Sequence, residues 1–317
     1  MARYLSNRLL QAILVLLIMS AVIYWLIGLM PGDPIDLMLS ANPKLTPADV
    51  ARLKALYGLD QPLYLRYFHW LVAALHGDLG YSRSFSLPVL AVLMPRLGNT
   101  AWLMGASFVI AVAAAVPIGV AAAMRPQGQF DTLINLLCFA GISIPSFWLA
   151  LLLIAFFAVD LGWLPAGGIV TIGDGSLLDR VRHLILPVAA LAVLSIAGFT
   201  RYTRAEMLEV MGEDYVRAAR AKGLPEPVIL FKHALRNALI PVVTVIGLDF
   251  GALFSGALVI ETMFAYPGMG KLIYDSIMGN DFNLAMIALL FATLMTILAN
   301  LLADLCVGWL DPRIRIA

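Results

Sequence analysis

The residue types that usually carry catalysis or metal binding form no recognisable site in this chain. Four histidines show no metal-ligand spacing, and none lies at the centre of an apolar run: His69, His76, His183 and His233. The run GMGK at 268–271 suggests a phosphate-binding loop, but Ala265 stands where that motif needs its first glycine, and Leu272 follows the lysine. No histidine is placed to activate a serine in a membrane segment, which argues against an intramembrane protease. The sequence therefore predicts no enzyme, no nucleotide site, no metal and no cofactor.

One ionisable residue, Asp249, lies in the middle of a long apolar run, where a charged side chain is costly and marks a functional position by default. At about 100° per residue it points away from a stripe of small residues at 247, 251 and 255 that suits close helix packing. Ala252 and Gly256 share its side and leave room beside it. We predict that Asp249, Ala252 and Gly256 line a path for a positively charged solute. The alternative is an Asp249 that is protonated or paired with a neighbouring helix.

A polar segment at residues 213–241 interrupts the apolar runs and is typical of two short helices joined at a corner. The first helix, 215–222, is rich in alanine and ends at Gly223, which adopts the left-handed conformation without steric cost. Pro225 and Pro227 suit the first turn of the second helix. The basic face of that helix consists of Lys232, His233 and Arg236. Small alanines allow another protein to approach closely, so the segment is predicted to be a docking site.

These residues also carry a resemblance to a known family. Ala218, Ala219 and Gly223 match the Ala-Ala, three residues, Gly core of the cytoplasmic "EAA" loop of ABC importer permeases. The strings DYVRAARAKG and HALRNALIPV resemble the peptide and nickel branch, which includes the B-type oligopeptide and dipeptide permeases. Arg217 replaces a glutamate of the wider family, and HALR replaces its Ile and Leu-Pro positions, which we interpret as marks of the branch. Five further motifs, in the order of the branch, extend the resemblance to nearly the whole chain: PGDP at 31–34, YGLDQPL at 57–63, HGDLGYS at 76–82, YPGMGK at 266–271 and DPRIR at 311–315.

The resemblance implies an all-α integral membrane protein with six transmembrane helices in the type I permease fold, and a helical extracytoplasmic segment between the first two spans. It implies half of a translocation path for peptides, with a second permease subunit, two cytoplasmic ABC ATPases and an extracytoplasmic substrate-binding protein as partners. It places residues 213–237, here called the elbow, in a cleft of one ATPase. The coupling residues it implies are Glu213, Asp214, Tyr215, Arg217, Ala218, Ala219, Arg220, Lys222 and Gly223. A nickel complex or another small solute is the alternative substrate.

The composition independently indicates a membrane protein, because 62% of the residues are hydrophobic and only 13% are charged. Six apolar runs each have at least about 20 residues, enough for a helix to cross a hydrocarbon core of about 30 Å. These runs are 9–30, 100–124, 131–159, 184–204, 238–262 and 284–310. They are continuous rather than alternating, which favours helices over barrel strands. Membrane lipid is therefore a predicted partner, and nothing supports binding to nucleic acid.

The positions of Lys and Arg predict the topology. With the N-terminus inside, twelve of the 21 basic residues fall in cytoplasmic segments, and only Arg180, Arg182 and Lys271 fall in short outer loops. Both termini and the elbow are then cytoplasmic, and the resemblance places the chain in the inner membrane of a bacterium or archaeon. The predicted divisions are an N-terminus and first span at 1–30, an extracytoplasmic segment at 31–98, a five-helix core at 99–310 with a coupling loop at 205–237, and a cytoplasmic tail at 311–317.

The long segment 31–98 contains helix signals of its own. Thr46 is a predicted N-cap for a helix that ends near Gly58, and a second helix is predicted from Pro62 to a stop at Gly77. The second helix is rich in aromatic residues, which suits the membrane interface. It is interpreted either as a lid on the helix bundle or as a docking surface for an extracytoplasmic partner.

An ion-coupled secondary transporter is the competing class of function. It predicts paired inverted repeats and several ionisable groups within the membrane. The sequence shows no such repeat, and Asp249 stands nearly alone at depth. A membrane-bound enzyme is less favoured still, because no pair of nucleophile and base can be assembled.

Overall fold

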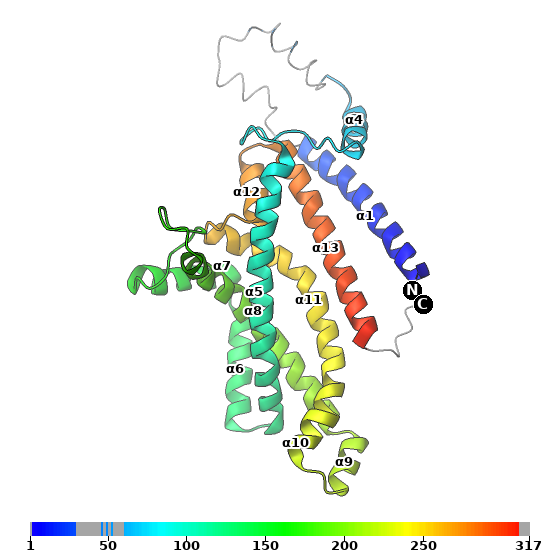
Figure 1. Cartoon of the computed structure of the whole chain (residues 1–317), viewed down its shortest axis with the longest axis vertical. Helices are drawn as coiled ribbons and strands as arrows, with labels where there is room; N and C mark the ends of the chain where they lie inside the picture. Colours follow the sequence, from blue (N-terminus) through cyan, green and yellow to red (C-terminus); the bar gives the residue numbers. More distant parts are fainter. Residues whose placement is uncertain (1, 30–45, 47–48, 50–51, 53–59, 311–317) are drawn as a thin grey trace. The chain divides into compact units, whose positions relative to one another are not determined.

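The computed structural model describes residues 2–29, 46, 49, 52 and 60–310 (Figure 1). Within these residues the regular structure is helical, apart from two isolated β-bridges. The chain divides into two compact units. The first comprises Met1–Tyr4, Leu97–Lys271 and Met295–Ala317, and the second comprises Leu5–Arg96 and Leu272–Leu294. The absence of strands in the described part confirms the predicted all-α class.

The first unit contains most of the helices that the structure describes. They are most of α5 (Val89–Met124), α6 (Gln129–Ser143), α7 (Ser146–Leu153), the π-helix η1 (Ile154–Asp160), α8 (Leu177–Met211), α9 (Asp214–Ala221), α10 (Glu226–Val228), the π-helix η2 (Ile229–Ala234), α11 (Leu235–Met263) and the second half of α13 (Phe282–Leu310). The long helix α8 packs against α6, α7 and α11. It is therefore the helix around which this unit is assembled.

The second unit contains most of α1 (Ala2–Gly28), α4 (Leu63–Leu75), the start of α5, most of α12 (Met269–Met278) and the first half of α13. The turn between α12 and α13 is attached to the segment before α5 through Asp281. Its carboxylate accepts hydrogen bonds from the Ser82 hydroxyl at 2.5 Å and the Ser84 amide at 2.9 Å. Burial raises the pKa of Asp281, but these hydrogen bonds outweigh burial and hold the pKa below its ordinary value.

Five of the six predicted spans correspond to helices long and apolar enough to cross a membrane: Ser6–Gly28, Val89–Met124, Leu177–Met211, Glu226–Gly247 and Phe282–Leu305. The third predicted span, 131–159, is instead divided into α6 and α7–η1, which meet at an angle of 102°. Pro145 explains the break, because a proline cannot donate the helical hydrogen bond and disfavours helical geometry in the residue before it. Pro187 and Pro241, by contrast, lie inside the continuous helices α8 and α11.

Close helix crossings in the first unit depend on glycine. A Cβ atom on Gly119 of α5 would lie 2.7 Å from the Thr203 Cβ atom of α8, so only glycine allows this approach. On the other side of α8, a Cβ on Gly141 of α6 would lie 3.0 Å from the Ala197 Cβ atom. Small residues that let helix backbones meet are the expected way to pack helices where lipid removes the hydrophobic driving force.

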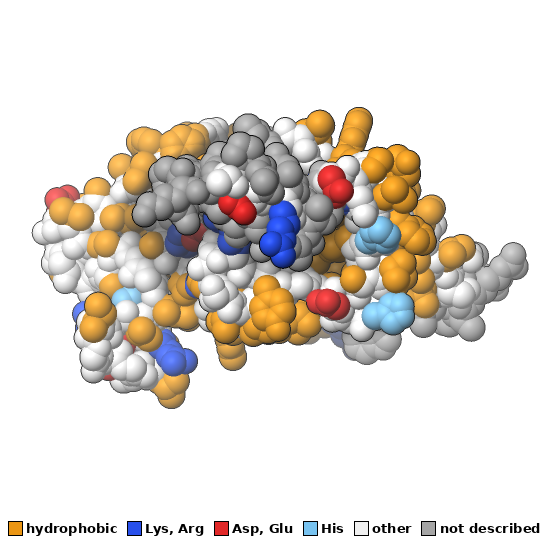
Figure 2. Space-filling model, turned by 90° about the horizontal axis from the view of Figure 1, so that it is seen from above, with side chains coloured by type: hydrophobic (Ala, Val, Ile, Leu, Met, Phe, Trp, Pro, Cys, Tyr) orange, Lys and Arg blue, Asp and Glu red, His pale blue; other side chains and the backbone are white. Residues whose placement is uncertain are grey.

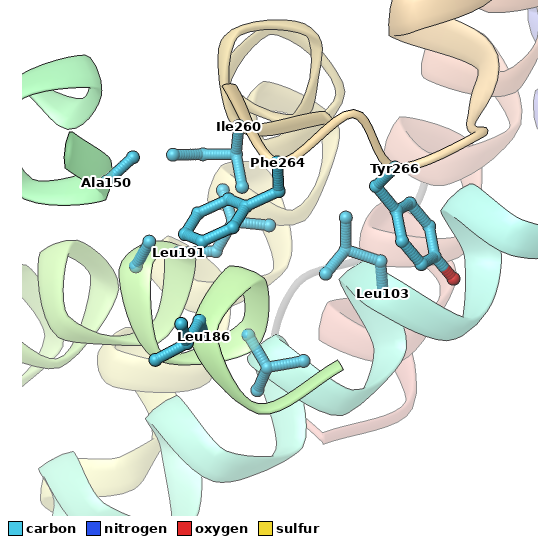
Figure 3. Close-up of a cluster of buried hydrophobic side chains, with 9 residues drawn as sticks. Leu103, Ala150, Leu186, Leu191, Ile260, Phe264 and Tyr266 are labelled. Carbon is cyan, nitrogen blue, oxygen red and sulfur yellow. The ribbon is translucent and has the colours of Figure 1, made fainter. Parts of the chain in front are cut away.

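A buried cluster joins α5, α7, α8 and α11 where α11 ends. Figure 3 shows the Phe264 ring near Leu191 and the Tyr266 ring beside Leu103. Both rings are fully buried, and Tyr266 donates a hydrogen bond from its hydroxyl to the Asn99 carbonyl at 3.1 Å. Burial, reinforced by the nearby Glu261, raises the pKa of Tyr266 to about 12. The hydroxyl therefore stays protonated and remains a donor across the physiological pH range.

Large hydrophobic side chains are exposed over much of the described surface. Figure 2 shows them across the face seen from above, with only scattered charged groups among them. Examples on the spans include Leu10 of α1, Val109 of α5 and Leu136 of α6, each at least 65% exposed. Soluble monomers rarely expose contiguous apolar surface on this scale, so these faces match a protein surrounded by lipid.

The predicted extracytoplasmic segment is only partly described. Thr46 and Asp49 form reciprocal hydrogen bonds, since the Asp49 amide donates to the Thr46 hydroxyl and the Thr46 amide donates to the Asp49 carboxylate. The rest of the helix predicted to end near Gly58 lies outside the described residues. The second predicted helix is confirmed as α4, and Gly77 follows it with a φ of 88°. The span after the segment starts at Val89, earlier than the predicted boundary at 98.

Candidate coupling site and translocation path

Most of the predicted coupling residues lie on the open surface of α9 and the turn after it. Exposed side chains or backbone are found at Glu213, Asp214, Tyr215, Arg217, Ala218, Arg220, Lys222 and Gly223. Ala219 is the exception, because its side chain is only 6% exposed and faces the chain's own core. The side chain of Ala219 therefore packs within the chain, whereas the sequence pattern predicts that the alanines of this helix lie on the surface that another protein approaches. Ala218 and Ala221 present small side chains on the exposed surface of the helix.

An apolar seat holds α9 against the rest of the unit. Val216 and Ala219 of α9 are buried together with Ile229 of η2, and Val210 and Met211 of α8 pack against them. A neighbouring cluster extends this contact from α8 to α5 and to α11 through Met207, Val120 and Ala238. The elbow is thus fixed to the ends of long helices and is not a loose loop.

The corner after α9 is closed by its own backbone hydrogen bonds. Gly223 has a φ of 75°, as predicted for a glycine that follows a helix. The Leu224 amide donates to the Ala219 carbonyl at 3.3 Å, and the Gly223 amide donates to the Arg220 carbonyl at 2.9 Å. This pair of bonds is the Schellman arrangement, which satisfies carbonyls that the helix end would leave unpaired. No atom lies within 4 Å of the position of a Cβ on Gly223, so the requirement for glycine comes from the backbone angle and not from crowding.

Polar side chains tie α9 to the segments on both sides of it. Arg217 pairs with Asp214 and donates a hydrogen bond to the Gly212 carbonyl at 3.1 Å. Across the corner, the Nε atom of Arg220 lies 2.7 Å from the Oε1 atom of Glu226. These contacts link α9 to the residues that precede it and to α10.

A further hydrogen bond links α9 to the first turn of α11. Asn237 donates from Nδ2 to the Tyr215 hydroxyl at 2.9 Å, and also to the His233 carbonyl at 3.1 Å. Tyr215 is thereby held against the helix that carries the basic face. Any force on α9 therefore reaches α11 through this side-chain contact as well as through the apolar seat.

The second half of the elbow differs from the predicted separate helix. Pro225 is the N-cap of α10 and Pro227 lies in its first turn, as predicted. However, α10 continues through the π-helix η2 into α11 without a break. The elbow is therefore one short helix, α9, packed on the first turns of a long helix that also carries Asp249.

Asp249 lies on α11 with an exposed side chain, and no hydrogen bond or ion pair joins it to another residue that the structure describes. On the same helix, a Cβ on Gly247 would lie 3.1 Å from the Ala303 Cβ atom of α13. This close approach agrees with the predicted packing face at Gly247. Ala252 and Gly256 lie on α11, but their side chains are outside the described part of the structure.

Two buried acidic residues were not singled out from the sequence. Asp131 of α6 is 2% exposed and forms a two-point ion pair with Arg204 of α8, whose Nη2 atom lies 2.7 Å from Oδ2. Glu261 near the end of α11 is fully buried and accepts hydrogen bonds from the Thr100 hydroxyl at 2.5 Å and the Lys271 amide at 3.0 Å. A carboxylate at the edge of an apolar run was the available signal, but its partners are far away in sequence. Among the described residues, no group of His, Cys, Asp and Glu could hold a metal ion.

Comparisons with known proteins agree with this arrangement. The chain matches two family descriptions, "Binding-protein-dependent transport system inner membrane component" over residues 115–316 and its N-terminal counterpart over residues 1–103. It is 41% identical to the "Oligopeptide transport system permease protein AppB" of Bacillus subtilis, over 99% of this chain and 100% of that protein. It is 37% identical to the "Dipeptide transport system permease protein DppB" of Escherichia coli, over 91% of each chain.

Solved structures support the fold. The chain is similar to a subunit of the MetNI methionine ABC transporter, captured in an inward-facing form, with a TM-score of 0.57 and 19% identity. That alignment covers 71% of this chain and 98% of the other. An amino acid ABC transporter gives a TM-score of 0.54 at 17% identity. At such identities the likeness concerns the fold, which is that of ABC importer permeases. Together with the sequence matches, it shows that the chain belongs to the family of binding-protein-dependent transport system inner membrane components.

Proposed function

We propose that this chain is the peptide-transporting permease subunit of an ABC importer, and that its elbow receives the movement of a cytoplasmic ATPase. The substrate class is supported by the oligopeptide and dipeptide permeases to which the chain is similar over nearly its whole length. The observation that carries the coupling role is the contrast within α9. One face is buried in an apolar seat, and the opposite face is exposed around Ala218.

Coupling requires rigid transmission from the docking face to the spans. The α9 helix is fixed to α8 and η2 by its buried face, to α10 by the pair of Arg220 and Glu226, and to α11 by Tyr215 and Asn237. A push on α9 is therefore passed to α8 and α11 with little local yielding. In this proposal two ATPases and a second permease subunit complete the importer, and a substrate-binding protein delivers the peptide from outside.

The path is proposed to run along the face of α11 that carries Asp249. An acidic side chain in the middle of a span is expensive against lipid, so its exposed face is expected to meet water or a second subunit. The carboxylate would attract the amino terminus of a peptide. Ala252 and Gly256 are proposed to widen the path beside it, and both termini and the elbow are proposed to be cytoplasmic.

The test of coupling places a bulky charge on the docking face without disturbing the seat. The importer is purified through a tag on this chain with Ala218→Arg, and with Ala205→Arg on exposed α8 as the matched control. We expect that the ATPases no longer co-purify with Ala218→Arg, or that the rate of ATP hydrolysis stimulated by binding protein and peptide falls at least tenfold. The control is expected to keep both, because its arginine lies outside α9.

Two results would contradict the proposal. If Ala218→Arg keeps full stimulated hydrolysis, the exposed face of α9 is not the docking face. If the unmodified chain purifies without an ATPase and transports in vesicles driven only by an ion gradient, the importer itself is excluded and a secondary transporter takes its place.

A further inference from the structure

An apolar cleft of about 270 Å³ lies within the second unit, between α1, α4 and α13. Its walls are side chains from 13–20 of α1, from 70–74 of α4 and from 287–294 of α13, with Leu79 at one edge. The only hydroxyl in the lining belongs to Ser20, and it is already bonded to the Leu17 carbonyl at 2.8 Å and to the Tyr67 hydroxyl. The one polar group of the lining left without a partner is the Trp70 indole N–H, and a single donor is too few to hold water in the cleft.

The cleft lies at membrane depth. The candidate span of α1 ends at Gly28, and Ser20 is eight residues before that end. At about 1.5 Å per residue, Ser20 lies about 12 Å below the end of the span, within a hydrocarbon core of about 30 Å. Ile287 and Leu290 of α13 lie a similar short distance inside the span that begins at Phe282. Both long walls thus face the acyl chains of the leaflet on the side where α1 ends.

Aromatic side chains lie beside the cleft, between Ser20 and the end of α1 at Gly28. Tyr67 and Trp70 of α4 pack against Tyr24 of α1, with ring centroids 5.5 Å and 6.0 Å from the Tyr24 ring. Such rings are favoured at the level of lipid headgroups, where one end is apolar and the other is wet. Arg66 of α4 lies near enough to Tyr24 to act on it electrostatically, and it brings a positive charge to this level. Trp70 lines the cleft, and its indole N–H is buried without an acceptor in the part of the chain described.

We propose that this cleft binds one acyl chain of a membrane phospholipid, with the headgroup beside Arg66. The cleft is open to the surroundings of the helices, so at this depth about 270 Å³ is available to a molecule of the bilayer. Water is unfavourable there because the walls are apolar, whereas hydrocarbon fits both the lining and the depth. The ester region of the lipid would supply the acceptor that Trp70 lacks, and Arg66 would face the phosphate. The site anchors α4 to the bundle and needs no role for the elbow.

Photolabelling tests the proposal in the intact importer. The complex is reconstituted in vesicles of phosphatidylethanolamine and phosphatidylglycerol that contain phosphatidylethanolamine with a diazirine in one acyl chain. After irradiation, labelled peptides are mapped by mass spectrometry. We expect labelling around Leu17 and Leu290 to exceed that around the lipid-facing Leu133 and Leu137 of α6, because a held chain stays near its labelling site.

Variants that fill the cleft provide the decisive comparison. Ala74→Phe places a ring in the cleft and is expected to lower labelling of both walls at least fivefold, while Ala73→Phe, beside it but outside the lining, does not. Leu290→Trp fills the cleft from the opposite wall and guards against a local folding defect in α4. The proposal would be overturned if α1, α13 and α6 were labelled equally and if neither Ala74→Phe nor Leu290→Trp changed the labelling. An efficient cross-link from Leu17→Cys to the second permease subunit would also overturn it, since a protein helix would then occupy the cleft.

Discussion

Two connections between helices of the first unit carry motifs that resemble the permease family, and they differ in whether their polar side chains are exposed or buried. In the elbow, the polar side chains are exposed and contact one another on the surface, as Arg220 does with Glu226. In the turn after α11, residues 264–271, the polar groups are buried and form hydrogen bonds within the chain. Glu261 binds the Thr100 hydroxyl and the Lys271 amide, and Asn99 donates to the Pro267 carbonyl at 2.8 Å.

The two turns differ in the role that their polar groups play, which is to fix a position in one and to remain open to a partner in the other. In the buried turn these polar groups bond within the chain, and the network holds the turn and the end of α11 against α5. In the elbow, α9 is held by one apolar seat that it shares with Ile229, and its other side chains are exposed. A turn built to stay in place hides its polar groups, and a turn built to be contacted shows them. Mutations in the first should therefore damage folding, and mutations in the second should damage coupling.

The largest effect is expected at the buried carboxylate. Glu261→Ala leaves the Thr100 hydroxyl and the Lys271 amide buried without their acceptor, which should cost about 2–6 kcal/mol of folding free energy. The measurement is the yield and thermal unfolding of the purified complex. Glu209→Ala, at an exposed position on α8, is the control and should unfold like the unmodified chain. Equal unfolding of both variants would remove the distinction between the two turns.

A pair of glycines sharpens the comparison. A Cβ on Gly268 would overlap the Glu261 carboxylate, so Gly268→Ala should destabilise by about 1–3 kcal/mol or more through overpacking. At Gly223 nothing is crowded, so Gly223→Ala should cost only the strain of a positive φ, about 1–2 kcal/mol. Thermal unfolding ranks the two. A larger loss at Gly223 would mean that the elbow, and not the buried turn, is the tightly packed connection.

The same pair separates coupling from folding. Gly223→Asn should restore most of the stability lost in Gly223→Ala, because asparagine tolerates the left-handed region better than alanine. If the angle of the corner sets coupling, ATP hydrolysis stimulated by the binding protein should fall in the alanine variant and recover in the asparagine variant. Hydrolysis that falls equally in both would indicate that the glycine itself is contacted by the ATPase.

A third connection, between α12 and α13, tests whether the buried design recurs. Hydrogen bonds to Asp281 hold its pKa below its unfolded value, so its contribution to stability is present at neutral pH and is lost as the pH falls through the folded pKa. Asp281→Asn should lower stability at pH 7. Because the variant has no carboxylate to protonate at this position, its stability should fall less than that of the unmodified protein between about pH 5 and pH 3. The measurement is the thermal unfolding midpoint against pH for both proteins. Parallel curves would mean that Asp281 does not contribute in this way.

The smallest effect on stability is expected at the exposed pair. Arg220→Ala or Glu226→Ala should leave the unfolding temperature nearly unchanged, because solvent screens the interaction. Stimulated hydrolysis should nevertheless fall several-fold in either variant if the pair sets the direction of α9. The exchanged variant, Arg220→Glu with Glu226→Arg, should recover part of it. Failure of the exchange, with both single variants impaired, would indicate direct contact of these residues with the ATPase.

Local signals in the sequence located most elements and helix ends correctly. The stop at Gly223, the start at Pro225 and the end of α4 before Gly77 all depend on the residue's own backbone preferences, which act within a few positions. The sequence marks Pro145 as an interruption but assigns 131–159 to a single span, because the run is apolar on both sides of the proline and hydropathy does not record the 102° change of direction. The continuity from α10 through η2 into α11 was not predicted either, because a polar stretch at the start of a long helix resembles a separate short helix.

The sequence by itself determined that the chain is a helical membrane protein, where nearly all of its spans lie, and which motifs relate it to permeases. These follow from composition and from patterns that repeat over one or two turns. Only the tertiary structure decided that Ala219 is buried while Ala218 is exposed, and that Asp131 meets Arg204 and Glu261 meets Thr100. These facts depend on contacts between residues far apart in the chain. No local pattern encodes them, because each partner is supplied by a different helix.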